Sequence, residues 1–142
     1  MNISRNDSRV LAMVILYQIG LYSRRNIPFI IDDLISNNTI QIDGDISFVR
    51  ELVFGVIEHE EILEKVANRY LVKWDIHRLG LTDGAILKIA IYELLYTDTP
   101  KKVCIDEAIE LAHDFSDEKV VGMINGVLDK VLREEIEDYH AE

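Results

Sequence analysis

The stretch TDGAILKIAIYELLY, residues 82–96, decides the fold class. Its apolar residues recur at steps of three and four, which is the period of an α-helix, and few positions are left for a polar face. Thr82 is a suitable N-cap, because its hydroxyl can accept a hydrogen bond from a backbone N–H of the first turn. We therefore expect a helix that runs to Tyr96 with nearly all of its apolar residues in the core.

The same helical period extends in both directions from this stretch, and we find no convincing strand. The pattern predicts a further enclosed helix early in the chain, a short helix after Pro28, one long amphipathic helix, and two helices that follow the quoted stretch. These expected helices cover residues 8–22, 29–35, 46–71, 105–115 and 120–136, the last one capped by Ser116 or Asp117. The sequence thus predicts an all-α fold, a compact single-domain bundle of about seven helices over residues 1–142.

Composition restricts the class of protein further. The chain has 142 residues, 49% of them hydrophobic and 29% charged, which is typical of one folded domain. Its one cysteine, Cys104, has no internal disulfide partner, and no stretch has the length of a membrane span. The first apolar run, residues 10–17, is not followed by a signal-peptide cleavage site, so we expect no secretory signal and a cytoplasmic protein.

The charge is distributed unevenly. The whole chain has a formal net charge of −11, which argues against a general nucleic-acid binder. Residues 1–30, however, hold four arginines against Asp7 alone and carry +3, which leaves −14 on the remainder. The amino-terminal end is therefore a small basic region on an acidic protein.

No arrangement of residues indicates catalysis or a metal site. The segment His59-Glu60-Glu61-Ile62-Leu63 begins like a zinc-binding helix motif, but it has no second histidine one turn later. His113, which lies near Glu110 and Asp114, fits a solvated helix face better than a ligand set. Cys104 has acidic neighbours, which would raise its thiol pKa and make it a poor nucleophile. We expect no metal, no cofactor and no enzymatic activity.

Several ordered segments of the chain have distinctive sequences. They are AILKIAIYELL (85–95), PKKVCIDEAIELA (100–112), INGVLDK (124–130), FVRELVFGV (48–56) and the first-helix pattern at 12–18. The most distinctive letters within them are Tyr92-Glu93, Asp106-Glu107-Ala108 and Asn125-Gly126. In this order the segments closely resemble the signature regions of the NusB family of transcription antitermination factors. The resemblance implies a NusB-like bundle of seven helices. It also implies a protein that binds the box A element of nascent RNA together with NusE, a protein of the small ribosomal subunit. Such a complex helps RNA polymerase to transcribe through ribosomal RNA operons.

Arg5 and Arg9 are the first candidates for RNA contact. Both lie at the start of the first expected helix, where cationic side chains and backbone N–H groups favour phosphate. We expect Arg9→Ala to weaken RNA binding without changing the thermal midpoint. Lys102 could hold a further phosphate from the turn before its helix. Two to four such contacts would give a salt slope of roughly −1.4 to −2.8, at about −0.7 per phosphate.

Tyr17 and Tyr70 are further RNA-contact candidates by resemblance, although an aromatic residue at helical spacing is more often part of a core. Asn125 and Gly126 interrupt an apolar helix, which either close packing or ligand approach would justify. We favour packing for Gly126 and keep Asn125 as an RNA candidate. Met123 stands where some family members have an aromatic residue that contacts RNA.

The acidic residues Asp83 and Glu93 are candidates for contact with NusE, although salt bridges within the helix would explain them equally well. Two alternatives to the antitermination function stay open. One is a protein-interaction module of the same fold, or a homodimer, with weak or no RNA binding. The other is a regulatory domain of an RNA-modifying enzyme, although a chain of this length has no room for a catalytic domain as well.

Overall fold

The computed structural model describes residues 4–21, 33 and 46–136. These residues form six α-helices and one short 3-10 helix, with no strand among them. The elements are α1 (Arg5–Leu21), α3 (Ser47–Glu58), α4 (Glu60–Tyr70), η1 (Ile76–Arg78), α5 (Leu81–Tyr96), α6 (Lys101–Phe115) and α7 (Glu118–Glu135). The all-α prediction is confirmed, and the expected helix at 29–35 lies almost wholly outside the described residues.

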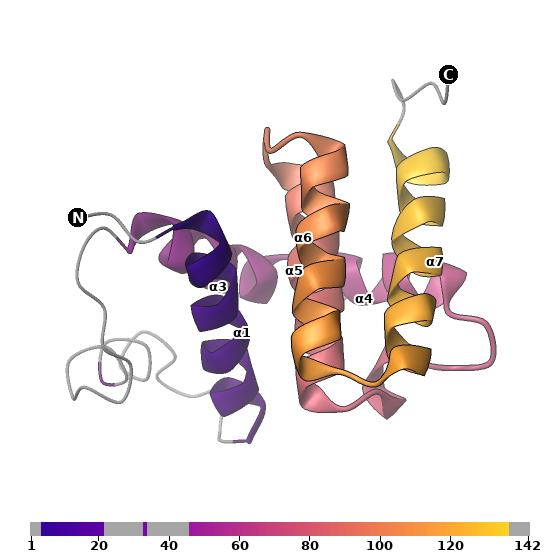
Figure 1. The fold of residues 1–142 in the computed structure, drawn as a ribbon, viewed down its shortest axis with the longest axis horizontal. Coiled ribbons are helices and arrows are strands. Elements are labelled where there is room, and N and C mark those ends of the chain that lie inside the picture. The colour runs from indigo at the N-terminus through magenta and orange to yellow at the C-terminus, as the bar shows by residue number, and fades with distance from the viewer. Residues whose placement is uncertain (1–3, 22–32, 34–45, 137–142) are drawn as a thin grey trace.

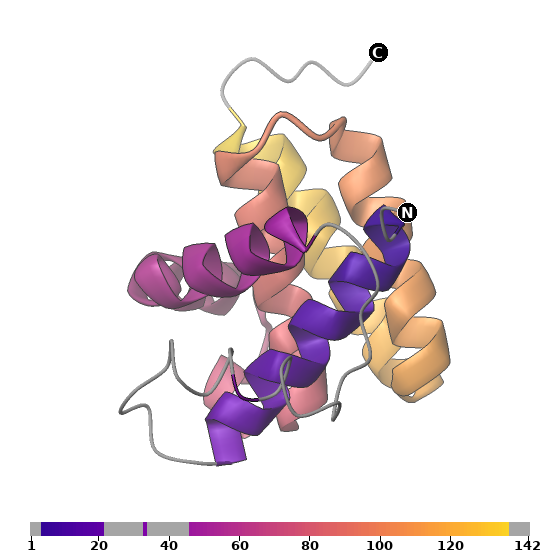
Figure 2. The same cartoon turned by 90° about the vertical axis from the view of Figure 1, so that its left-hand side faces the viewer.

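Helix α5 is the centre of the bundle and contacts α1, α3, α4, α6 and α7. In Figure 1, α1, α5, α6 and α7 stand roughly upright, while α3 and α4 run across them; Figure 2 shows the same crossing from the side. The position of α5 explains its composition, because a helix covered on all sides has no polar face to maintain. Its fully buried side chains include Ile86, Leu87, Ile91 and Leu94.

Several predicted helix boundaries are wrong. Helix α6 begins at Lys101, so Lys102 lies in its first turn rather than in the turn before it. Helix α5 begins at Leu81 rather than after Thr82, because Gly80 takes the N-cap position and its carbonyl accepts the Gly84 N–H. The expected long helix 46–71 is interrupted at His59, whose backbone leaves the helical conformation (φ −105°, ψ 14°). Asp117 is the N-cap residue of α7, as predicted, but its side chain makes no capping hydrogen bond.

The break at His59 accompanies a stack of aromatic rings. The centroids of the His59 and Tyr96 rings are 4.0 Å apart, and the angle between the two ring planes is 15°. The Tyr92 ring stacks beside both of them. Tyr92 also packs directly on Gly55 of α3, where an added Cβ would overlap the phenol ring. The absence of a side chain at Gly55 is therefore what lets α3 approach α5 so closely.

We predict that Gly55→Ala destabilises the fold by about 1–3 kcal/mol, because the new methyl group must displace a buried tyrosine. Gly126→Ala is the matched control, since its Cβ would have no neighbour within 4 Å. That change should stabilise α7 by about 0.5–1 kcal/mol, the difference in helix propensity. Denaturant unfolding of both variants measures the effects, and equal effects of the two changes would contradict the close packing of Tyr92 on Gly55.

Candidate functional site

A groove of about 530 Å³ lies between the end of α4, the connection 71–80, the start of α5 and one face of α7. Two aromatic side chains, Tyr70 and Trp74, line it, and Met123 and Val127 face them from α7. Trp74 and Val72 are 53% and 68% exposed, although both are large and apolar. An apolar surface that stays open to water in this way is typical of a binding site.

The groove is also locally basic. Arg78, Lys119 and Lys130 line it and are exposed, and Asp83 is the one acidic residue among its lining residues. Asp83 is half-buried, and it accepts a hydrogen bond from the Ser116 hydroxyl. On a chain with a net charge of −11, this concentration of cations makes the groove a favourable place for an anionic ligand.

Two glycines of α7 open the groove on its helical side. Gly122 and Gly126 are one turn apart, both are exposed, and a Cβ at either position would meet nothing within 4 Å. Our expectation that Gly126 serves helix packing is therefore wrong. Each glycine weakens the helix by about 1 kcal/mol relative to alanine, and what it provides is free space beside the backbone.

Tyr70 is the one predicted RNA-contact residue that lines this groove. It is half-buried, and burial together with the charges of Glu135 and Glu134 raises the pKa of its phenol. The hydroxyl therefore stays protonated at neutral pH, and it donates its hydrogen bond to Glu135.

The other candidates lie elsewhere. Tyr17 is 37% exposed on α1, and Asn125 is exposed on α7, but neither lines the groove. Lys102 is exposed in the first turn of α6, beyond the carboxyl end of α5, whereas the groove lies at the amino end of that helix. The 16 residues of α5 separate the two places by about 24 Å.

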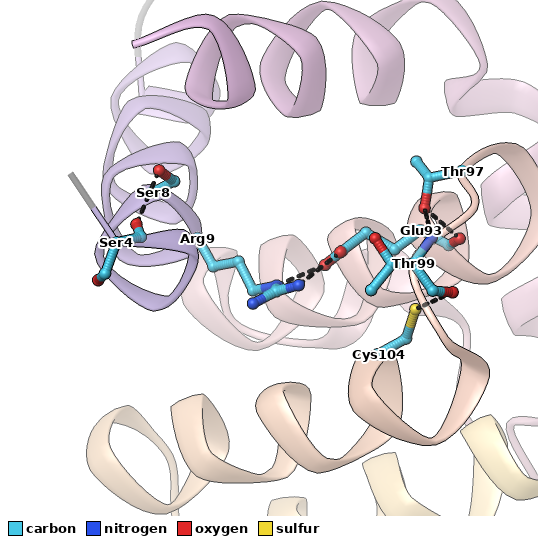
Figure 3. A network of polar contacts seen from close by, with 7 residues as sticks. All are labelled: Ser4, Ser8, Arg9, Glu93, Thr97, Thr99 and Cys104. Carbon is cyan, nitrogen blue, oxygen red and sulfur yellow. Dashed lines mark hydrogen bonds and ion pairs between the residues drawn. The ribbon is translucent and has the colours of Figure 1, made fainter. Parts of the chain in front are cut away.

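Arg9 and Glu93 form a buried ion pair, which corrects both of their predicted roles (Figure 3). The Arg9 Nε donates to Glu93 Oε2 at 2.7 Å and Nη2 donates to Oε1 at 2.8 Å. Their side chains are 4% and 1% exposed. Burial alone would lower the pKa of the Arg9 guanidinium, but the hydrogen bond and charge of Glu93 outweigh it and raise that pKa. Arg9 is thus not available to phosphate, and Glu93 is not an exposed contact for a partner.

Arg5 remains accessible at the start of α1. Its guanidinium lies 3.8 Å from the centre of the Phe48 ring, a cation–π contact that fixes it against α3. It lines a polar pocket that also holds Glu51, Asp98 and Glu107, so acidic groups surround this arginine. Its role in RNA contact stays a prediction.

The residues considered for catalysis or metal binding are buried or pair with another side chain. Cys104 is buried; burial, followed by the charge of Glu93, raises its thiol pKa to about 11. His113 approaches Glu118 at 3.4 Å rather than forming a ligand set with Glu110 and Asp114. Within the described parts of the chain, no group of three or more His, Cys, Asp or Glu residues could hold a metal ion.

Our sequence analysis named Tyr70, Asp83, Met123 and Gly126, but it missed Trp74 and the three cations of the groove. Lys119, Met123, Gly126 and Lys130 follow steps of three and four, so they share one face of α7, and this spacing is visible in the sequence. Trp74 gave a weaker signal, as an aromatic residue within an expected connection. That these two segments face each other depends on how α4, α5 and α7 pack.

Comparison with known proteins decides the family. The model of the NusB family matches residues 6–133. The chain belongs to the NusB family. It is 37% identical over 133 residues to the transcription antitermination protein NusB of Ligilactobacillus salivarius (strain UCC118), covering 93% of this chain and all of that protein. It is 41% identical over 135 residues to the same protein of Staphylococcus aureus (strain Newman), covering 92% and 99%.

Solved NusB structures share the fold of this family member. T. maritima NusB superposes with a TM-score of 0.81 at 29% identity, over 94% of both chains. A complex of the antitermination factors NusB and NusE with double-stranded RNA superposes with a TM-score of 0.77 at 21% identity, over 91% of this chain and 96% of that one. At that identity, the second similarity concerns the fold alone. No helix in the described parts of this NusB-family chain is long and apolar enough to span a membrane.

We predict that Arg9→Ala destabilises the fold by about 3–5 kcal/mol, because it leaves the Glu93 carboxylate buried without a partner. The double variant Arg9→Met with Glu93→Leu removes both charges and should be as stable as the unmodified chain or more stable. Thermal unfolding of the three proteins measures this. An unchanged midpoint in Arg9→Ala, as the sequence alone suggested, would show that the ion pair does not contribute.

We also predict that Cys104 is unreactive in the folded protein. With a pKa of about 11, about one thiol in a thousand is ionised at pH 8, and the side chain is buried. Iodoacetamide should label the chain at pH 8 only after denaturation. Because the folded state holds this proton more tightly, stability should fall as the pH rises from 9 toward 11. Rapid labelling of the native protein would contradict this burial.

Proposed function

We propose that this chain binds box A RNA of ribosomal RNA operons together with NusE, and so supports processive transcription by RNA polymerase. The observation that carries the proposal is the groove, in which two aromatic side chains and three cations lie together on an acidic protein. In this function, residues 1–142 act as one RNA-binding helical domain. A factor acting on nascent bacterial RNA would work in the cytoplasm.

The groove has the features that single-stranded RNA requires. Unpaired bases stack on aromatic side chains, and Tyr70 and Trp74 supply such faces. Arg78, Lys119 and Lys130 can neutralise phosphates on either side. The open backbone at Gly122 and Gly126 lets a nucleotide approach α7 more closely than a side chain would allow.

A partner protein would account for the remaining charge. Three phosphate contacts give a salt slope of roughly −2 for single-stranded RNA, which is a weak grip for a protein of net charge −11. A basic partner such as NusE would add its own positive field and dock on acidic surface, with Asp83 at the edge of the groove as our candidate contact. A solved complex of the same fold contains NusB, NusE and double-stranded RNA together, which supports a partnership of this kind. Arg5, Lys102, Tyr17 and Asn125 stay candidates for RNA that extends beyond the groove.

One observation favours the alternative of a protein-interaction module or homodimer. Because Arg9 is paired with Glu93, the amino-terminal basic region has one fewer helical arginine that could contact RNA. If the groove also fails to hold RNA, what remains is a surface for a protein.

The test is fluorescence anisotropy of a labelled box A-like RNA and of a scrambled RNA, titrated with this protein alone and with NusE at several salt concentrations. We expect tighter binding to the box A-like RNA, strengthened by NusE. Lys119→Ala should weaken binding and reduce the salt slope by about 0.7, because one phosphate contact is lost.

Lys65→Ala is the matched control for this test, since Lys65 is exposed on α4 and does not line the groove. It should leave both affinity and salt slope unchanged. Equal, weak binding of both RNAs with and without NusE would reject the antitermination function and favour the interaction module. If Lys119→Ala and Lys65→Ala have equal effects, the groove is not the RNA site.

A further inference from the structure

The connection between α4 and α5, residues 71–80, forms one wall of the groove, and we call it the strap. It contributes Val72, Trp74, Arg78, Leu79 and Gly80 to the lining. These residues come from a segment with only one short 3-10 helix, so their positions depend on whatever holds the strap in place.

Asn68 of α4 holds the strap through two hydrogen bonds. Its Oδ1 accepts the backbone N–H of Ile76 at 2.8 Å, and its Nδ2 donates to Asp75 Oδ2 at 3.2 Å. Asp75 Oδ1 in turn accepts the N–H of His77 at 2.9 Å and caps the 3-10 helix. One side-chain amide of α4 therefore fixes both the backbone and the capping carboxylate of the strap.

Further contacts anchor the same part of the strap. The Ile76 side chain is buried, and His77 Nε2 lies 3.0 Å from Glu64 Oε2 on α4. The segment before it is different, because Val72 and Trp74 are exposed and Lys73 between them has φ 71°. A non-glycine residue in this left-handed conformation is strained, and it persists where its surroundings impose it.

We propose that Asn68 is a positioning residue for the groove: it fixes the strap so that Trp74 and Arg78 stand ready on the wall that faces α7. The inference rests on the proposed RNA-binding function. Asn68 is half-buried and does not line the groove, so its effect on a ligand passes through the strap. A wall fixed in advance binds more tightly, because less conformational entropy is lost when the ligand arrives.

The hydrogen-bond pattern allows a reciprocal test. Asn68→Ala removes both contacts to the strap. Asn68→Asp keeps an acceptor for the Ile76 N–H but places two carboxylates together. Adding Asp75→Asn to that variant exchanges donor and acceptor, so every hydrogen bond described above can form again.

Trp74 is the chain's single tryptophan, so its fluorescence reports on the strap without any ligand. In Asn68→Ala and Asn68→Asp we expect faster anisotropy decay and stronger acrylamide quenching of Trp74. Affinity for the box A-like RNA in the presence of NusE should fall about tenfold, as expected for the loss of one to two hydrogen bonds. The double variant should restore both readouts, and Lys65→Ala should change neither. Far-UV circular dichroism confirms that each variant is folded.

The outcomes separate this inference from the proposed function. Unchanged Trp74 fluorescence in Asn68→Ala, or freed Trp74 with unchanged affinity, overturns the positioning role while RNA binding stands. Failure of the double variant to restore affinity also overturns it. If the unmodified chain binds neither RNA nor NusE, the proposed function fails, and Asn68 then has no ligand to serve even where the fluorescence shows that it holds the strap.

Discussion

The buried ion pair between Arg9 and Glu93 is the constraint on which the position of α1 depends. Two charges that are nearly inaccessible to water tolerate few arrangements, because either one left alone is strongly unfavourable. The bidentate contact joins the first helix to the central one, 84 residues later in the chain. A packing in which α1 slides or turns on α5 would break this ion pair and is therefore strongly unfavourable. Apolar contacts alone would give such a shift a smaller free-energy cost.

The sequence predicted the elements whose signal is local. Helix α5 was recognisable from its nearly unbroken apolar stretch, and α7 from its stripe. The interruption at His59 was hidden, because the apolar period of α3 continues into α4 without a change of phase. Arg9 could not be interpreted correctly either, since an arginine at a helix start looks the same whether it faces solvent or a distant carboxylate.

The groove illustrates the same limit for the candidate site. Tyr70 and Asp83 were singled out from sequence and do line it, but the cations and the tryptophan were not. Each of its walls is ordinary by itself: the last turn of a helix, a ten-residue connection and one helical face. Their combination depends on α4 and α7 both packing against α5, so the local excess of positive charge arises only on folding.

The open glycines of α7 have a consequence for motion. Together they remove about 2 kcal/mol of helix propensity from two adjacent turns, on the side where no neighbouring side chain compensates. Those turns should therefore open locally more often than α5, and their amides should exchange hydrogen faster. A ligand lying on them would slow that exchange, so the proposed ligand-binding face of α7 is also one that binding would order.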